Sequence, residues 1–273
     1  MSSWGRMTGG SSPRQRRWAA LAAVFLGASL LWGCQSADPA RDEYRLAGIE
    51  QMDQGDYEGA IASFEEAIAH SDGRVGEFEI DVLKYRGEAE YKAEDYPAAA
   101  HTYGVLLQVD GEDPDYYYLR SMAYSAQDMT AEAEADAQAA SELEQSRGQL
   151  SPVMEEAMAA LGGAWMKAGD QEKAEAVFDR VLTAGTATAQ TYSLLGLACL
   201  DGDQAELAEG YFEQGMALTQ PGSEEYGSLL WNRAAALEYS GDFSGARELL
   251  EEYVSSYGAD PEVEREIRFL ETR

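Results

Sequence analysis

The chain has little of the chemistry from which enzymes and metal centres are built. Its 273 residues include only two cysteines and two histidines. The histidines, His70 and His101, have no cysteine or histidine at the spacing of a metal site. There is no glycine-rich phosphate loop, Gly-x-Ser-x-Gly elbow or His-Glu-x-x-His motif. We therefore expect no catalysis, no cofactor and no bound metal, and two cysteines provide no disulfide framework.

Basic residues are also scarce. The chain has 20 lysines and arginines against 50 aspartates and glutamates, a formal net charge of −30. All 50 acidic residues lie after position 33, together with 16 of the 20 basic residues. Residues 34–273 therefore carry a formal net charge of −34. Such a charge argues against nucleic acid as a partner and against electrostatic adhesion to anionic lipid. It is explained by solubility, and attraction of a basic partner is the alternative.

What the sequence does have is a regular spacing of small residues. Six of them, 34 to 41 residues apart, serve as reference positions: Gly48, Gly87, Ser121, Gly162, Gly196 and Ala234. Twelve residues after each comes an alanine: Ala60, Ala99, Ala133, Ala174, Ala208 and Ala246. Sixteen residues after each come Phe64, Tyr103, Ala137, Phe178, Phe212 and Leu250, of which only the third is small. A period near 34 residues predicts a solenoid of identical two-helix units.

A polar turn separates the two predicted helices of each unit. Examples are Gln54–Tyr57, Ala168–Gln171 and Ser240–Phe243. Glycine is suited to end the first helix in the left-handed conformation, and the aspartate after it is suited to cap the second. The turn of the third unit, Gln127–Ala131, lacks glycine. No strand is expected, because valine and isoleucine are sparse and no alternating run is long.

The units are followed by a closing element. We expect six repeats at about 41–74, 80–113, 114–147, 155–188, 189–222 and 227–260. Asp260 and Pro261 read as the cap and first residue of a last helix, 261–273. In that helix Val263, Ile267 and Leu270 form one apolar stripe. The stripe predicts that the helix covers the exposed face of the last repeat.

Residues 41 to about 260 resemble the tetratricopeptide repeat (TPR) family. The stretch Gly55-Asp-Tyr-Glu-Gly-Ala-Ile-Ala-Ser-Phe64 is similar to that family's consensus. Arg86, Arg120 and Arg233 stand directly before reference positions, where the family usually has leucine. We expect these arginines to bury their stems between helices and pair with nearby carboxylates. The resemblance implies an all-α, superhelical solenoid with a capping helix.

The resemblance also implies a partner-binding groove lined by the first helix of each repeat. The lining positions of the family carry here Arg45, Lys84, Tyr91, Lys92, Tyr118, Met122, Met166, Lys167, Leu197, Leu200, Trp231 and Tyr239. Basic groups among aromatic and apolar side chains describe a surface for a peptide with some acidic character. The alternative is that these residues pack against the next repeat. The family's two-asparagine carboxylate clamp is not expected, because Asn232 is the only asparagine.

Residues 1–33 resemble a bacterial lipoprotein signal peptide. Three arginines within 14–17 precede an uncharged stretch, 18–32, that is too short to span a bilayer comfortably. It leads into Leu31-Trp-Gly-Cys34, which is similar to a lipobox, whose cysteine is acylated, with palmitate for example, and becomes the N-terminus. Residues 34–40 would be the lipidated cysteine and a short tether. The alternative is an uncleaved signal anchor.

Together these features predict a non-enzymatic, membrane-anchored scaffold that binds a protein or peptide partner in its groove. We expect it to be exported and held by its N-terminal lipid at the outer face of a bacterial cytoplasmic membrane, or in a periplasm. The resemblance includes lipoproteins that assist pilus or outer-membrane protein assembly in the cell envelope. The alternatives are a binding module for an envelope polymer or small ligand, and a structural spacer.

Overall fold

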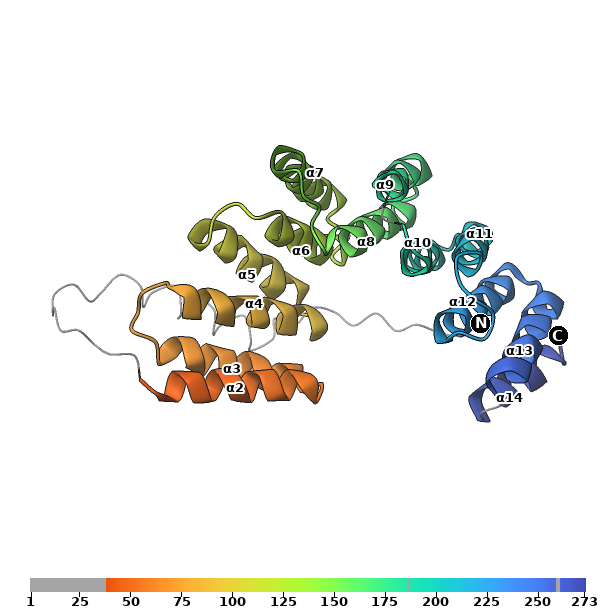
Figure 1. The fold of residues 1–273 in the computed structure, drawn as a ribbon, viewed down its shortest axis with the longest axis horizontal. Helices are drawn as coiled ribbons and strands as arrows, with labels where there is room; N and C mark the ends of the chain where they lie inside the picture. Colours follow the sequence, from red (N-terminus) through yellow and green to blue (C-terminus); the bar gives the residue numbers. More distant parts are fainter. Residues whose placement is uncertain (1–37, 186, 259–260) are drawn as a thin grey trace, which may run out of the picture. The chain divides into compact units, whose positions relative to one another are not determined.

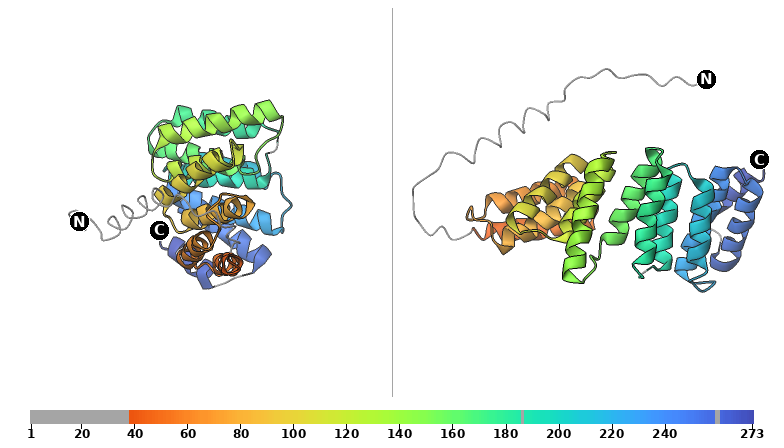
Figure 2. Two further views of the ribbon diagram at one scale, coloured as in Figure 1. Left: turned by 90° about the vertical axis from the view of Figure 1, so that its left-hand side faces the viewer. Right: turned by 90° about the horizontal axis from the view of Figure 1, so that it is seen from above.

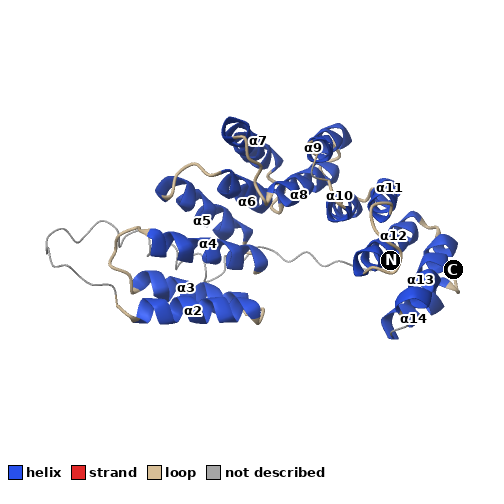
Figure 3. Cartoon of the chain, viewed as in Figure 1, coloured by secondary structure: helices blue, strands red, loops and turns tan. Residues whose placement is uncertain are grey.

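The computed structural model describes residues 38–185, 187–258 and 261–273. Over these ranges the secondary structure is entirely α-helical, without a strand (Figure 1 and Figure 3). The helices are α2 (Ala40–Asp53), α3 (Tyr57–Ala69), α4 (Glu77–Lys92), α5 (Tyr96–Val109), α6 (Pro114–Ser125), α7 (Thr130–Arg147), α8 (Met154–Lys167), α9 (Gln171–Thr183), α10 (Ala189–Asp201), α11 (Ala205–Met216), α12 (Glu224–Ser240), α13 (Phe243–Tyr257) and α14 (Pro261–Leu270). The all-α fold predicted from the sequence is confirmed.

Consecutive helices pack as pairs, from α2 with α3 to α12 with α13. The small reference residue of each first helix is where the two helices come close. A Cβ added at Gly48 would lie 2.5 Å from Phe64 Cε1, and one at Gly196 would lie 2.3 Å from Phe212 Cε1. The alanines twelve residues after the reference positions are buried in all six pairs. The spacing seen in the sequence therefore reflects an aromatic ring packed directly on helix backbone.

The third pair, α6 with α7, is built differently at this point. Its reference residue is Ser121, and the position sixteen residues later holds Ala137 in place of a large side chain. The Ser121 hydroxyl donates a hydrogen bond to the carbonyl oxygen of Ala133 on α7, at 2.8 Å. A polar contact thus connects the two helices where the other pairs use a larger apolar side chain.

The turns between paired helices share one backbone conformation at the seventh residue after each reference position. The angle φ is between 58° and 90° at Gly55, Glu94, Asp128, Gly169, Asp203 and Gly241. In each turn the next N–H donates to a carbonyl five residues back, as Asp56 does to Gln51 and Met129 to Tyr124. The third turn, which lacks glycine, therefore keeps the geometry of the others.

The pairs stack in chain order, but not in the same way throughout. Near both ends the second helix of a pair packs against the first helix of the next, as α3 does against α4 and α11 against α12. In the middle the first helices pack on one another, with α8 in contact with both α6 and α10, while α9 makes no comparable contact with α10. Figure 1 and Figure 2 show α7 and α9 projecting from this row of first helices. Side chains of α7, α8 and α9 line a pocket at this point, described below.

Helix α14 packs against α13 and closes the C-terminal end of the stack. Val263 and Leu270 are buried with Ala234, Ala246 and Leu250 in one apolar cluster. The predicted C-terminal capping helix is confirmed.

The predicted signal peptide, residues 1–33, lies outside the described residues, as do Cys34 and the first residues of the 34–40 tether. The last residue of that segment, Ala40, begins α2. None of the helices from α2 to α14 is long and apolar enough to cross a membrane.

Candidate functional site

The predicted groove residues all lie on the first helices of the pairs, α2, α4, α6, α8, α10 and α12. Five of them are exposed to solvent: Lys84, Lys92, Lys167, Leu197 and Tyr239. Five more are half-buried: Arg45, Tyr91, Met122, Leu200 and Trp231. We call these ten residues the first-helix surface. The two remaining residues, from the middle of the stack, are buried.

The prediction that Tyr118 faces the groove is wrong. Its side chain is 0% exposed and packs in the cluster that contains Ala133, Ala137 and Ala140 of α7. The phenol donates a hydrogen bond to Glu144 Oε2 at 2.9 Å, and burial raises the pKa of Tyr118. The apolar side chains that α7 buries here are alanines, and the ring of Tyr118 fills the space beside them.

The prediction that Met166 is exposed in the groove is also wrong. Its side chain is 4% exposed, because α8 packs directly against α10. A Cβ added at Gly202, just after α10, would lie 2.3 Å from Met166 Cβ. Met166 therefore follows the alternative, packing against the next repeat, whereas Tyr118 is buried between α7 of its own pair and α8 of the next.

The basic residues of the first-helix surface are each paired with a carboxylate of the protein itself. Lys92 Nζ lies 2.9 Å from Glu88 Oε1, one helical turn away, and this partner raises the pKa of Lys92. Arg45 Nε lies 2.5 Å from Asp81 Oδ2, which raises the pKa of Arg45.

The other two lysines have similar partners. Lys84 Nζ lies 3.7 Å from Asp110 Oδ2, and Lys167 Nζ lies 3.9 Å from Asp201 Oδ2. With every one of these cations already beside an anion, the surface offers less attraction to an acidic partner than the lysines alone suggested.

Apolar side chains are left exposed toward the C-terminal end of this surface. Leu197 on α10 is 43% exposed and Tyr239 on α12 is 75% exposed. Trp231, also on α12, is half-buried and meets the ring of Tyr253 edge to face, with 5.8 Å between the ring centroids. Helices α10 and α12, which carry these three side chains, are in contact.

The arginines before the reference positions do what the sequence predicted. Arg120 on α6 makes a two-pronged ion pair with Asp136 on α7, with both N–O distances 2.7 Å. Arg86 Nη2 lies 3.2 Å from Glu65 on the preceding helix α3. Arg233 is paired in the same way with Glu209 and Glu213 of α11. These arginines therefore join neighbouring helices.

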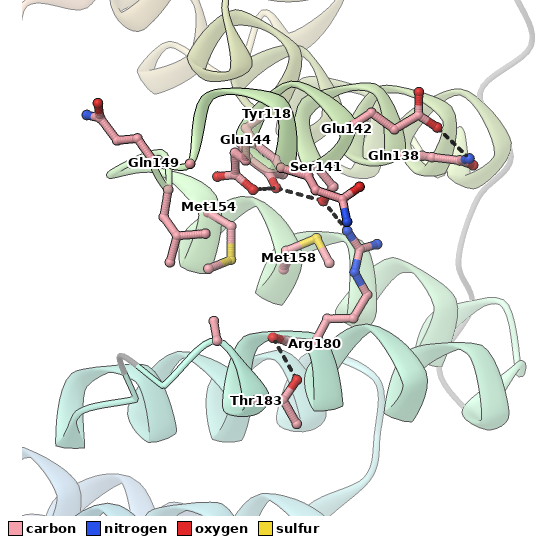
Figure 4. Close-up of a pocket in the computed structure, with 14 residues that line it drawn as sticks. Tyr118, Gln138, Ser141, Glu142, Glu144, Gln149, Met154, Met158, Arg180 and Thr183 are labelled. Atoms are coloured by element: carbon pink, nitrogen blue, oxygen red, sulfur yellow. Dashed lines mark hydrogen bonds between the residues drawn. The ribbon is translucent and has the colours of Figure 1, made fainter.

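A pocket that the sequence analysis missed lies between α7, the start of α8 and the end of α9 (Figure 4). Its volume is about 630 Å³. It is lined by Tyr118, Gln138, Ser141, Glu142, Glu144, Gln145, Gly148, Gln149, Leu150, Met154, Met158, Arg180, Thr183 and Ala184. We call it the second-helix pocket. One signal in the sequence points to this place: the distance between Ser121 and Gly162 is the longest of the repeat spacings.

The described residues contain no group of three or more histidines, cysteines or carboxylates placed to hold a metal ion. Cys199 is buried on α10, as expected for a small apolar side chain. Burial raises the pKa of its thiol to about 12.

Three solved structures of similar fold place these helix pairs among known proteins. A tetratricopeptide repeat protein from Parabacteroides merdae matches with a TM-score of 0.59 at 16% identity, over 87% of each chain. PilW, a type IV pilus biogenesis factor, matches with a TM-score of 0.55 at 18% identity, over 84% of this chain and 99% of that one. The quorum sensor NprR from B. thuringiensis matches with a TM-score of 0.55 at 13% identity, over 94% of this chain and 74% of that one. No protein-family model and no curated protein matches the sequence. The likeness shows a TPR fold.

Proposed function

We propose that this protein is a non-catalytic TPR scaffold, attached to a bacterial membrane through a lipid on Cys34, that holds a protein partner on its first-helix surface. The observation that carries the proposal is the exposure of Leu197 and Tyr239 on α10 and α12. Large apolar side chains left exposed on helices that are in contact, as α10 and α12 are, are typical of protein interaction sites, where aromatic residues are enriched.

The partner we infer is a largely apolar segment. The four cations of the first-helix surface have carboxylates of their own, so they add little to the attraction of an acidic peptide. Binding energy at such a surface comes mainly from apolar side chains that become fully buried in the complex.

Anchoring rests on the sequence alone. An acyl chain on Cys34 would be joined to α2, which begins at Ala40, by a few residues. Since an extended residue spans at most about 3.6 Å, the first helix pair would stay within roughly 25 Å of the lipid surface. Membrane-bound partners would therefore be within reach.

The first experiment is chemical cross-linking and affinity capture from the native cells. The parent chain is compared with a double variant, Leu197→Asp with Tyr239→Ala, and with the control Leu218→Asp. Leu218 is 58% exposed and lies just after the second helix α11, so the control makes the same leucine-to-aspartate change as at Leu197 but away from the first-helix surface. Circular dichroism first verifies that all three chains are folded.

We expect one protein to be captured by the parent and the control and lost in the double variant. Capture of the same proteins by all three chains would refute the first-helix surface as the binding site. If the parent captures no protein but binds a purified glycan fragment, and the double variant loses that binding, the alternative function of binding an envelope polymer would be favoured.

Anchoring is tested separately by growing cells with labelled palmitate. The label should enter the parent chain and be absent from Cys34→Ser, and the variant should leave the membrane fraction. Equal labelling of both chains would contradict lipidation at Cys34.

A further inference from the structure

Helices α7 and α9 are bridged at two levels, with the same spacing on each helix. Lys173 Nζ on α9 lies 3.5 Å from Glu134 Oε2 on α7. Seven residues further along both helices, Arg180 donates a hydrogen bond from Nη2 to the hydroxyl of Ser141 (Figure 4). Seven residues are about two helical turns, so the second bridge repeats the geometry of the first. The difference is the acceptor, a carboxylate at the first level and a neutral hydroxyl at the second.

In the second bridge Arg180 therefore has a neutral hydroxyl as its partner and no carboxylate. It takes part in none of the ion pairs made by the described residues, although the chain has 50 carboxylates. A guanidinium has five N–H donors arranged in a fork that suits a carboxylate. A single hydroxyl leaves most of these donors available.

The two glutamates of the second-helix pocket do not supply the missing anion. Glu144 is buried, and its two oxygens accept from the phenol of Tyr118 and from the backbone N–H of Ser151, at 2.9 and 2.6 Å. Glu142 accepts from Gln138 at 3.0 Å, in a bridge along α7 itself. Figure 4 shows Arg180 extended toward Ser141, separate from the bond between Glu142 and Gln138.

The rest of the pocket offers apolar contact and amide groups. Leu150, in the link between α7 and α8, is 43% exposed, and the buried side chains of Met154 and Met158, 5% and 1% exposed, line the inner wall of the same pocket. Two glutamines, Gln145 and Gln149, are exposed beside them and can bond to a peptide backbone. A volume of about 630 Å³ is in the range of small-ligand and peptide sites.

We propose that the second-helix pocket binds a short peptide segment that presents a carboxylate to Arg180 and an apolar side chain to Leu150 and Met154. The carboxylate would complete the second bridge as Glu134 completes the first. This site is distinct from the first-helix surface, because it is built mainly from second helices, and it does not depend on lipid anchoring. It gives the protein a second binding site, for a partner of different chemistry.

The carboxylate can come from an acidic side chain or from the end of a chain, so three synthetic tripeptides serve as probes. The first is Ac-Leu-Leu-Asp-NH2, the second is Ac-Leu-Leu-Leu with a free C-terminal carboxylate, and the third is Ac-Leu-Leu-Asn-NH2. Binding to the full chain is followed by NMR of methyl-labelled methionine, which reports directly on Met154 and Met158. We expect at least one carboxylate probe to shift these signals. Binding of the aspartate probe alone identifies a side-chain carboxylate as the ligand group, and binding of the free C-terminus alone identifies a terminal carboxylate.

Two variants separate the proposal from a general effect on folding. Arg180→Gln should lower the affinity for the carboxylate probe by about tenfold or more, the usual effect of losing a charge-assisted hydrogen bond. Ser141→Asp should weaken binding of the carboxylate probe as well, because the new carboxylate would pair with Arg180. Lys173→Gln, which removes the first bridge and the contact of Lys173 with the Trp165 ring, is the control and should bind the probe like the parent.

Three results would overturn the proposal. The first is that no probe shifts the methionine signals at millimolar concentration. The second is that the asparagine probe binds as tightly as the aspartate probe, and the third is that Arg180→Gln and Ser141→Asp bind the carboxylate probe as the parent does. Ser141→Asp adds an ion pair with Arg180 but also replaces the hydroxyl that lies 3.1 Å from the Tyr118 phenol, so its loss of binding supports the proposal only when the variant is as stable as the parent. A thermal melt of each variant verifies this point.

Discussion

The ring of Phe178 occupies the space where a side chain on Gly162 would be. A Cβ at Gly162 would lie 2.0 Å from Phe178 Cε1, closer than two non-bonded carbon atoms can approach. The two residues belong to different helices, α8 and α9, and stand sixteen positions apart in the sequence. Their complementarity holds the fourth helix pair together.

Gly162→Ala should destabilise the protein. The methyl group forces α8 and α9 apart or drives Phe178 out of its position, at a cost of about 1–3 kcal/mol in the free energy of unfolding. The measurement is urea unfolding followed by circular dichroism. Gly210→Ala on α11 is the control, because its Cβ would meet nothing within 4 Å. That change should stabilise the chain by about 0.5–1 kcal/mol, since alanine is the better helix former. Equal effects of the two changes would contradict the packing described.

Gln204→Asp should stabilise the protein by adding a helix cap. Gln204 is the N-cap of α11 and makes no side-chain cap hydrogen bond, whereas Asp170, its counterpart before α9, accepts from the N–H of Lys173 at 3.2 Å. We expect a gain of about 0.5–2 kcal/mol. Gln204→Ala should give no such gain, and Asp170→Ala should cost a similar amount. Thermal unfolding of the three variants tests this prediction. If Gln204→Ala raised the stability as much as Gln204→Asp, the helix cap would be ruled out as the source of the gain.

Glu90 should make stability depend on pH in the mildly acidic range. Its carboxylate is buried between Arg86 and Thr102, and desolvation raises its pKa. Between the unfolded value of about 4.3 and the raised folded value, the folded protein keeps a proton that the unfolded chain has released. The stability contributed by this group therefore falls as pH rises through that window.

The variant Glu90→Gln removes this dependence. Its free energy of unfolding relative to the parent should increase as pH rises from about 4.5 to neutral, as measured by urea unfolding at each pH. The hydrogen bond from Thr102 opposes the shift, so Thr102→Val should make the parent's dependence steeper. A difference between Glu90→Gln and the parent that stays constant with pH would mean that Glu90 titrates alike in both states.

Cys199 should resist alkylation in the folded protein. Burial raises the pKa of its thiol to about 12, and only the thiolate is nucleophilic. In a Cys34→Ser background at pH 8, iodoacetamide should react on the order of a thousandfold more slowly than in urea. An exposed thiol introduced by Leu218→Cys should react quickly in both conditions. Similar rates for Cys199 in both conditions would show that α10 opens readily.

The pairing of helices could be predicted because its determinants are close together in the sequence. A small residue and a large one sixteen positions later, as at Gly48 and Phe64, are complementary within one pair, so their spacing recurs whatever surrounds the pair. The capping helix could be predicted for the same reason, since Val263 and Leu270 lie on one face of one helix.

The stacking of pairs could not be predicted, and it decides which groove residues stay exposed. Met166 is covered because α8 lies against α10, a contact between residues some 36 positions apart that no local pattern indicates. Tyr118 is different: the undersized Ala137 was visible in the sequence and indicated a space that a neighbouring ring could fill.

The partners of the lysines were partly foreseeable. Lys92 has Glu88 four residues before it on a predicted helix, a spacing that places the two side chains together. Lys84 has its partner, Asp110, in the link after the next helix, and only the fold brings these two together. The second-helix pocket also depends on tertiary arrangement, because its lining residues come from α6, α7, α8 and α9.

The uniform turns have a consequence for how the molecule can change. Every turn within a pair lies at one end of the helices and spans two to four residues, whereas the links between the first five pairs and their successors lie at the other end and span four to seven. One rim of the stack therefore has short turns whose left-handed residue keeps a constant position, and we call it the constant rim; the links of the opposite, variable rim are longer and differ more in length. Segments can be lengthened or exchanged on the variable rim, around Gly73 or Gly222 for example, without altering a helix pair. On the constant rim a single added residue would displace the left-handed residue that all six turns share.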